Sequence, residues 1–148
     1  MDISRLKSQL KQAEGVRYTA YRDSLGFWTA GVGHLLSGDK DLPWGGKVFS
    51  VATVDRWLDE DVATAESNAQ GLLEWPSLDT DARQNALIEL VFNMGLAHWK
   101  QFALTRAALA HKQWDAAHSG LLDSLWAKQV GPNRSNRLAN QLLSGEFV

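Results

Sequence analysis

The feature that most constrains this fold is a segment in the second half of the chain that is apolar on nearly all sides of a helix. A helix without a polar face is stable only at the centre of a protein, covered by other elements. Asp79 or Thr80 is placed to cap its start, and Gly95 is placed to end it. The chain has 148 residues, 45% of them apolar, which is enough to build a core around this helix. The apolar residues of the segment are Ala82, Ala86, Leu87, Ile88, Leu90, Val91, Phe92 and Met94.

Amphipathic helices are predicted on both sides of this segment. The first runs from an N-cap at Asp2 to a glycine cap at Gly15, with apolar residues three and four positions apart. A long helix begins at Ser50 or Thr53, and Pro132 suits the first position of a final helix. Shorter helices are expected around residues 102–110, 113–118 and 121–128. The apolar face of the long helix consists of Val51, Val54, Leu58, Val62, Ala65 and Ala69.

Between the first helix and the long one, the pattern changes to short β-strands. The segment 23–26 is typical of the turn between two strands. Gly31 and Gly33 flank Val32 in the second of these strands. Residues 37–46, rich in Gly, Asp and Pro, are expected to form a loop. The residues that favour strands are Tyr18, Tyr21, Phe27, Trp28 and Val32.

The order of these elements predicts an α+β protein. A small N-terminal β-hairpin lobe is expected over about residues 15–50. A larger helical lobe is expected over about residues 51–148, together with the N-terminal helix. We expect a single domain over residues 1–148, with the active-site cleft between the two lobes.

Composition and spacing exclude several functional classes. The absence of Cys rules out disulfides, thiolate zinc sites and a Cys nucleophile. A net charge of -2 argues against nucleic acid as the main partner. The chain has no signal-peptide pattern at its start and no long apolar stretch, so we expect synthesis in the cytoplasm and no stable membrane association. The histidines do not have the HExxH spacing of zinc hydrolases. A metal site formed by His98, His111 and His118 is therefore disfavoured.

Two carboxylates and a hydroxyl in the N-terminal third are candidates for chemistry. Glu14 lies on the last turn of the first helix, where the macrodipole disfavours the charged form and so favours a general acid. Asp23 lies in the predicted turn, and Thr29 follows an aromatic pair in the next strand. Two carboxylates beside one cleft are the usual apparatus of glycoside hydrolysis. Each residue also has an ordinary interpretation, as a surface Glu, a turn Asp and a strand Thr.

Taken together, these residues resemble a known signature. The segment 14–36, EGVRYTAYRDSLGFWTAGVGHLL, is similar to the signature of phage-type lysozymes, the endolysins of glycoside hydrolase family 24. The spacings from Glu to Asp, from Asp to Thr and from Thr to Gly-Val-Gly-His all agree. Residues 86–95 resemble the central buried helix of that family, 114–117 the entry to a short helix, and 131–137 a proline-asparagine-arginine element.

The resemblance implies a peptidoglycan hydrolase that cleaves the β-1,4 bond between N-acetylmuramic acid and N-acetylglucosamine. It implies that Glu14 is the general acid that protonates the leaving oxygen. Asp23 is implied to support the positively charged sugar or to orient the attacking water, and Thr29 to help hold that water. The resemblance favours inversion, and it implies no metal and no organic cofactor.

The substrate is expected to contact residues on both lobes. Gly31 and Gly33 allow a close approach to the backbone. Leu35, Phe92 and Asn93 match family positions that line the cleft, although Phe92 fits a place in the core equally well.

Charged pairs are expected to support the site. His34 and Asp61 are interpreted as a structural pair, joined by a charge-assisted hydrogen bond. Arg134 and Arg137 are expected either to contact carboxylates beside the cleft or to lie on a solvated helix face.

Seven tryptophans are present, a number that hints at carbohydrate binding. Only Trp28 and Trp44 lie where they can touch a sugar. Trp75 is expected to anchor a junction between helices. The packing tryptophans on or beside helices are Trp57, Trp99, Trp114 and Trp126.

Three other functions stay open: a lytic transglycosylase of related fold, a non-catalytic cell-wall-binding module, and a purely structural helical domain. The first needs only one acid, the second needs no acid, and the third leaves the glycine-rich hairpin unexplained. The expected partner is bacterial peptidoglycan, and a monomer is the default. We expect action on the cell wall after release from the cytoplasm of a host bacterium, with a holin as one possible route.

Overall fold

The computed structural model describes all 148 residues and has the α+β organisation that the sequence predicts, with three strands near the N-terminus followed by helices. The chain divides into two compact units. The sheet unit is Ser4–Ala63, and the helical unit consists of Met1–Ile3 and Thr64–Val148. The N-terminal helix was expected to belong with the other helices, but nearly all of it lies in the sheet unit. The organisation as a single domain stays a prediction.

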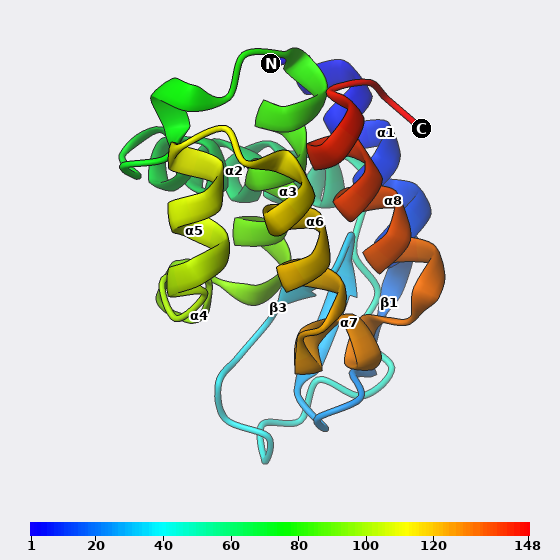
Figure 1. Cartoon of the computed structure of the whole chain (residues 1–148). Coiled ribbons are helices and arrows are strands. Elements are labelled where there is room, and N and C mark those ends of the chain that lie inside the picture. Colours follow the sequence, from blue (N-terminus) through cyan, green and yellow to red (C-terminus); the bar gives the residue numbers. More distant parts are fainter. The chain divides into compact units, whose positions relative to one another are not determined.

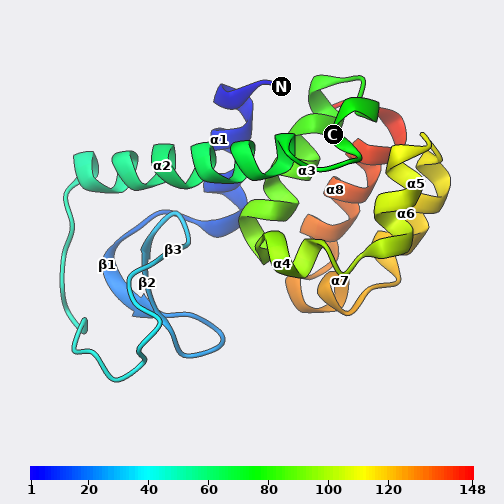
Figure 2. The ribbon, with the colours of Figure 1, turned by 90° about the vertical axis from the view of Figure 1, so that its left-hand side faces the viewer.

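The sheet unit starts with α1 (Ile3–Glu14), which buries Leu6 and Leu10. Gly15 ends the helix as predicted, with φ of 73° and a 2.9 Å hydrogen bond from its N–H to the carbonyl of Lys11. An antiparallel sheet follows in the order β1-β2-β3, and Figure 2 shows the long loop that leads from it to α2. The strands are β1 (Arg17–Arg22), β2 (Trp28–Gly31) and β3 (His34–Leu35).

The second and third strands correct one sequence prediction. Val32 and Gly33 do not continue the second strand, because they form the turn into β3. Gly31, the last residue of β2, and Gly33 have φ of 64° and 63°, a left-handed conformation in which an extended strand does not continue. The Gly-Val-Gly pattern at residues 31–33 therefore indicates a tight turn. The sequence did not predict the third strand, because it is only two residues long.

Helix α2 (Val51–Gln70) begins where the sequence predicts, since the Ser50 hydroxyl accepts a 3.1 Å hydrogen bond from the N–H of Thr53. Five of the six predicted face residues are buried. Val51 is the exception, with 58% of its surface exposed, because it lies in the first turn of the helix. The buried face consists of Val54, Leu58, Val62, Ala65 and Ala69.

The helical unit is built on α3 (Asp81–Met94), the segment predicted to be central. The Thr80 hydroxyl caps its start and Gly95 caps its end, as predicted. Helix α3 packs against α4 and α8, and α6 packs against α5 and α8 (Figure 1). The buried side chains of α3 include polar ones, namely Arg83, Asn85 and Glu89. The remaining elements are η1 (Trp75–Ser77), α4 (Leu96–Trp99), α5 (Ala103–Ala110), α6 (Trp114–Leu122), α7 (Leu125–Val130) and α8 (Pro132–Ser144).

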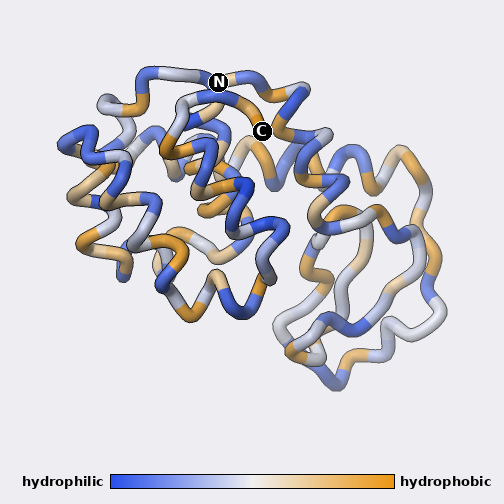
Figure 3. The backbone as a smooth tube through the Cα atoms, turned by 45° about the vertical axis from the view of Figure 1, so that its right-hand side comes forward, coloured by the Kyte–Doolittle hydropathy of each residue, from blue (hydrophilic) through white to orange (hydrophobic).

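Apolar and polar residues alternate along these helices (Figure 3), as expected for helices with one buried face. The helix α4 was not predicted because four residues are too few for a helical period to show. None of the helices combines the length and the apolar character that crossing a bilayer requires.

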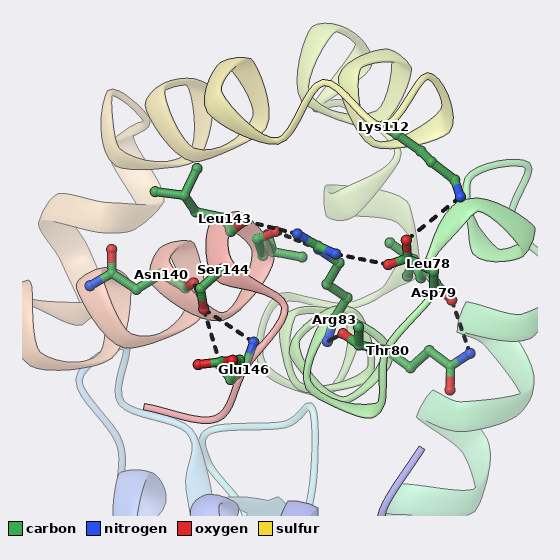
Figure 4. Close-up of polar contacts among 11 residues, drawn as sticks. Leu78, Asp79, Thr80, Arg83, Lys112, Asn140, Leu143, Ser144 and Glu146 are labelled. Carbon is green, nitrogen blue, oxygen red and sulfur yellow. Dashed lines mark hydrogen bonds and ion pairs between the residues drawn. The ribbon is translucent and has the colours of Figure 1, made fainter.

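The C-terminal turn of α8 is fastened by the buried Arg83 (Figure 4). Its guanidinium donates to the carbonyls of Leu142 and Leu143 and to the Asp79 carboxylate, each at 2.8 Å. Its flat face lies 3.9 Å from the ring centroid of Trp114. The guanidinium thus occupies carbonyls that the end of a helix leaves without partners.

Candidate active site

Glu14 ends α1 in the sheet unit, and its carboxylate lies against the turn between β2 and β3. Its side chain is half-buried. A Cβ added to Gly33 would lie 2.9 Å from Glu14 Oε2 and 3.1 Å from its carboxyl carbon. Gly33 is therefore required for two reasons, its left-handed backbone and the room that it leaves for Glu14. This second role of Gly33, beside the predicted contact with substrate, was not evident from the sequence.

Asp23 lies in the turn between β1 and β2, where the backbone holds one of its carboxylate oxygens. Asp23 Oδ1 accepts hydrogen bonds from the N–H groups of Leu25 and Phe27, both at 2.9 Å. The Asp23 N–H donates in turn to the Phe27 carbonyl at 2.8 Å. Oδ2 takes no part in these bonds. Asp23 is therefore a turn residue, as predicted. The turn also holds its carboxylate in one orientation.

Thr29 lies in the central strand of the sheet, with only 4% of its surface exposed. Its hydroxyl donates to the Phe27 carbonyl at 3.1 Å. Its register partners are Tyr21 in β1 and Leu35 in β3. Because a hydroxyl that donates one hydrogen bond keeps lone pairs that accept others, Thr29 keeps the capacity to bind water.

Tyr21 joins these groups, although the sequence analysis did not single it out as a site residue. Burial raises the pKa of the Tyr21 phenol, and the negative charges of Glu14 and Asp23 raise it further, against the opposing effect of Arg17. The Arg17 guanidinium lies 4.3 Å from the centroid of the Tyr21 ring. Both candidate carboxylates therefore act on one phenol. Register explains why Tyr21 was missed, because a bulge between Arg17 and Tyr21 sets the pairing with Thr29.

The predicted contact between His34 and Asp61 is confirmed. His34 Nδ1 lies 2.7 Å from Asp61 Oδ2, and the imidazole stacks on Trp57 at 4.4 Å with an interplanar angle of 11°. This pair joins β3 to α2 within the sheet unit.

The other predicted residues of the sheet unit have different surroundings. Gly31 is buried against α2, where a Cβ would lie 3.2 Å from Val54 and 3.5 Å from Trp57. The element that approaches its backbone is thus α2. Leu35 is 53% exposed and accessible to a ligand. The roles of both residues in substrate binding stay predictions.

In the helical unit, Phe92 and Asn93 lie side by side near the end of α3, and both are half-buried. Asn93 Oδ1 accepts a 2.7 Å hydrogen bond from Trp126 Nε1, which fixes the side chain and leaves the NH₂ group out of this contact. These two residues also stay predicted substrate contacts.

Arg134 and Arg137 both bind the carboxylate of Glu89, which is completely buried in α3. The distances are 3.0 Å from Arg134 Nε to Oε2, 2.7 Å from Arg137 Nη2 to Oε2 and 3.1 Å from Arg137 Nη1 to Oε1. The expected contact with a carboxylate is thus confirmed, and the solvated helix face is excluded. The sequence analysis did not identify Glu89 as the partner, because it treated α3 as an apolar segment.

A second buried carboxylate, Glu74, was also missed. It is 1% exposed and accepts from Trp99 Nε1 at 2.7 Å and from Arg106 Nε at 2.9 Å. The predicted packing roles of Trp99 and Trp126 are confirmed, since they are 0% and 3% exposed. The structure contains no group of three or more His, Cys, Asp or Glu side chains arranged to hold a metal ion.

The two tryptophans expected to touch sugar lie beside basic residues. The Arg22 guanidinium lies 4.4 Å from the Trp28 ring centroid, and the Lys47 ammonium lies 5.2 Å from that of Trp44. The indole N–H groups of both tryptophans are buried without a hydrogen-bond partner. Contact of either ring with sugar stays a prediction.

The chain is similar to known proteins over most of its length. The family model described as Phage lysozyme matches residues 11–141. A probable T4-type lysozyme of Dictyostelium discoideum is 27% identical over 97% of this chain and 96% of its own length. The endolysin of Salmonella phage P22 is 31% identical over 82% of this chain and 80% of its own. A peptidoglycan hydrolase of Pseudomonas phage phiKMV is 26% identical over 95% of this chain but only 15% of its own length. Since the family model spans most of the chain, including Glu14, Asp23 and Thr29, the protein belongs to the phage lysozyme family and is a glycoside hydrolase.

Proposed function

We propose that this glycoside hydrolase cleaves the β-1,4 bond between N-acetylmuramic acid and N-acetylglucosamine in bacterial peptidoglycan. The observation that carries the proposal is the position of three groups around strand β2: Asp23 is held in the turn before it, Thr29 lies within it, and Glu14 lies against Gly33 in the turn after it. Two carboxyl groups and a site for water are what glycoside hydrolysis requires. The names of the phiKMV and P22 relatives support a cell-wall substrate.

In the proposed mechanism, Glu14 donates its proton to the glycosidic oxygen while the bond from that oxygen to C1 breaks. Positive charge develops on C1 and the ring oxygen, and the Asp23 carboxylate stabilises it electrostatically. A water held by Thr29 adds to C1 from the face opposite the leaving group, and one of its protons passes to Asp23. Addition from that face inverts the anomeric configuration. Asp23 suits this role because the backbone fixes one of its oxygens while the other is not used in the turn.

The remaining parts of the proposal concern binding and biology. Leu35, Phe92 and Asn93 are proposed to contact the glycan. The enzyme is proposed to act as a monomer on the cell wall and to lyse a bacterial host. Release from the cytoplasm through a holin is one proposed route. The likeness to a phage endolysin supports the lytic role.

A wall-clearing assay of Glu14→Gln beside wild type tests the proposal. Glutamine keeps the shape of the side chain but has no acidic proton, so clearing of purified bacterial walls is expected to fall at least about 1000-fold. Glu60→Gln is the matched control, because Glu60 is an exposed residue of α2 with a 63% exposed side chain. Clearing by Glu14→Gln at the wild-type rate would refute the site assignment.

The products of wild type test the reaction itself. Hydrolysis releases one new reducing end for each bond cleaved and incorporates one oxygen from water. A 1,6-anhydromuramic product would instead establish a lytic transglycosylase, and binding to walls without any cleavage would establish a wall-binding module.

A further inference from the structure

We propose that Tyr21 is a further catalytic residue, whose phenolic hydroxyl donates a hydrogen bond to the sugar on which Glu14 and Asp23 act. This inference rests on the proposed function, because it assigns one more contact to the same site. It concerns a residue of β1 that neither charge nor helical spacing marks in the sequence.

The first argument is the face of the sheet on which Tyr21 lies. Tyr21 is the direct register partner of Thr29, and side chains of directly opposed residues lie on the same face of a sheet. The next pair, Arg22 and Trp28, lies on the other face, where the guanidinium stacks over the indole at 4.4 Å. Tyr21 therefore shares a face with Thr29, the residue proposed to hold the attacking water.

The second argument is the charge around the phenol. The carboxylates of Glu14 and Asp23 are both close enough to raise the Tyr21 pKa, in addition to the larger effect of burial. The raised pKa favours the protonated phenol, which acts as a hydrogen-bond donor. A hydrogen-bond donor near two carboxylates complements the oxygen acceptors of a sugar.

The third argument is that the ring is held while the hydroxyl is available. The Arg17 guanidinium covers one face of the ring at 4.3 Å from its centroid, and the ring is half-buried. No hydrogen bond within the chain occupies the hydroxyl. Because the ring is ordered before the substrate arrives, a hydrogen bond to the sugar costs little additional conformational entropy.

The test compares Tyr21→Phe with Tyr18→Phe, which removes a hydroxyl from the same strand. We expect Tyr21→Phe to hydrolyse soluble glycan chains from bacterial peptidoglycan about tenfold more slowly than wild type, the effect of one lost hydrogen bond. Tyr18→Phe is expected to stay within about twofold, and both variants are expected to unfold at the wild-type temperature. Wild-type rates for Tyr21→Phe would overturn the inference.

Binding distinguishes contact with the substrate from a purely structural role. In the Glu14→Gln background, which is expected not to cleave the glycan, adding Tyr21→Phe is expected to weaken binding of the soluble glycan about fivefold. Unchanged affinity in this background would overturn the proposed contact even if the rate falls.

Chemical modification provides a measurement that does not depend on a Tyr21 variant folding. Glycan bound to Glu14→Gln is expected to slow nitration of Tyr21 by tetranitromethane while leaving nitration of Tyr18 unchanged. Equal nitration of Tyr21 with and without glycan would contradict the inference. Glu14→Gln assayed beside these variants separates the two hypotheses. If it keeps full activity, the proposed site fails and the inference falls with it, whereas its inactivity beside a fully active Tyr21→Phe removes only the inference.

Discussion

The sheet unit and the helical unit hold their carboxylates by different means. In the sheet unit, backbone N–H groups bind one oxygen of Asp23, and the missing side chain of Gly33 leaves room for Glu14. In the helical unit, Glu74 and Glu89 are almost completely buried, and arginines bind both oxygens of each carboxylate.

This difference separates carboxylates that can react from carboxylates that cannot. A buried charge is tolerated only when partners replace the water it has lost, so the arginines that stabilise Glu74 and Glu89 also exclude a substrate from them. A carboxylate held through one oxygen has a fixed orientation and keeps the other oxygen for chemistry. Whether a carboxylate can take part in catalysis thus depends on the groups that bind it, and the number of acidic residues in the chain does not reveal this.

The largest expected effect comes from removing the charge of a buried carboxylate that arginines bind. Glu89→Gln removes the completely buried negative charge that both Arg134 and Arg137 bind. We expect the free energy of unfolding to fall by about 3 kcal/mol, measured by denaturant titration. Glu60→Gln, which changes the exposed pair with Arg56, is expected to cost less than about 0.5 kcal/mol. Equal losses in the two variants would remove the distinction drawn between the units.

The second prediction tests whether the missing side chain of Gly33 leaves the space that the Glu14 carboxylate occupies. Gly33→Ala places a methyl group 2.9 Å from Glu14 Oε2 at a φ of 63°. Displacement of the acid is expected to reduce wall clearing about 100-fold, and the backbone strain is expected to cost about 1 kcal/mol of stability.

Gly46→Ala is the matched control for this prediction. Gly46 has a comparable φ of 77°, but nothing lies within 4 Å of an added Cβ. It is expected to lose similar stability and to keep full activity. Loss of activity in both variants would show that strain alone explains the effect of Gly33→Ala.

The third prediction concerns an ion pair of the sheet unit that is only partly buried. Asp61→Asn removes the charge opposite His34 but keeps a hydrogen-bonding side chain of the same shape. Since the two side chains are 23% and 32% exposed, we expect a loss of about 1 kcal/mol in the free energy of unfolding at pH 6. A loss as large as that of Glu89→Gln would contradict the link between burial and cost.

The smallest expected effect concerns an exposed carboxylate of the helical unit. A hydrogen bond from Arg83 is the main cause that lowers the pKa of Asp79 below its ordinary value of 3.8 (Figure 4). Its contribution to stability is therefore present above pH 3.8 and is lost as the pH falls through the lower, folded-state pKa. Because solvent screens a carboxylate that is 44% exposed, we expect only about 0.5 kcal/mol.

Urea titrations of wild type and Asp79→Asn at a series of pH values measure this contribution. Wild type is expected to be the more stable protein at pH 6, and the difference is expected to shrink as the pH falls below 3.8. A difference that stays constant over this range would show that the charge of Asp79 contributes nothing.

Local chemistry explains why much of the fold was predictable. The caps at Gly15, Ser50, Thr80 and Gly95 and the turn at Asp23 depend on neighbours within a few residues, so their signals survive in the sequence alone. The apolar periods likewise identified the buried faces of α2 and α3. The grouping of Glu14, Asp23 and Thr29 was inferred from spacing and from resemblance to one family.

Contacts between distant residues were decided by the tertiary structure. Pairing across strands brought Tyr21 opposite Thr29, and positive φ angles at Gly31 and Gly33 end the expected second strand at Gly31, with a turn at Val32 and Gly33. The burial of Glu89 and Glu74 and their choice of arginine partners had no local signal, because those partners lie 45 and 32 residues away along the chain. The sequence by itself determined the long helices, the caps at Gly15, Ser50, Thr80 and Gly95, and the candidate acid. The tertiary structure decided which carboxylates stay accessible, because accessibility depends on packing between segments far apart in the chain.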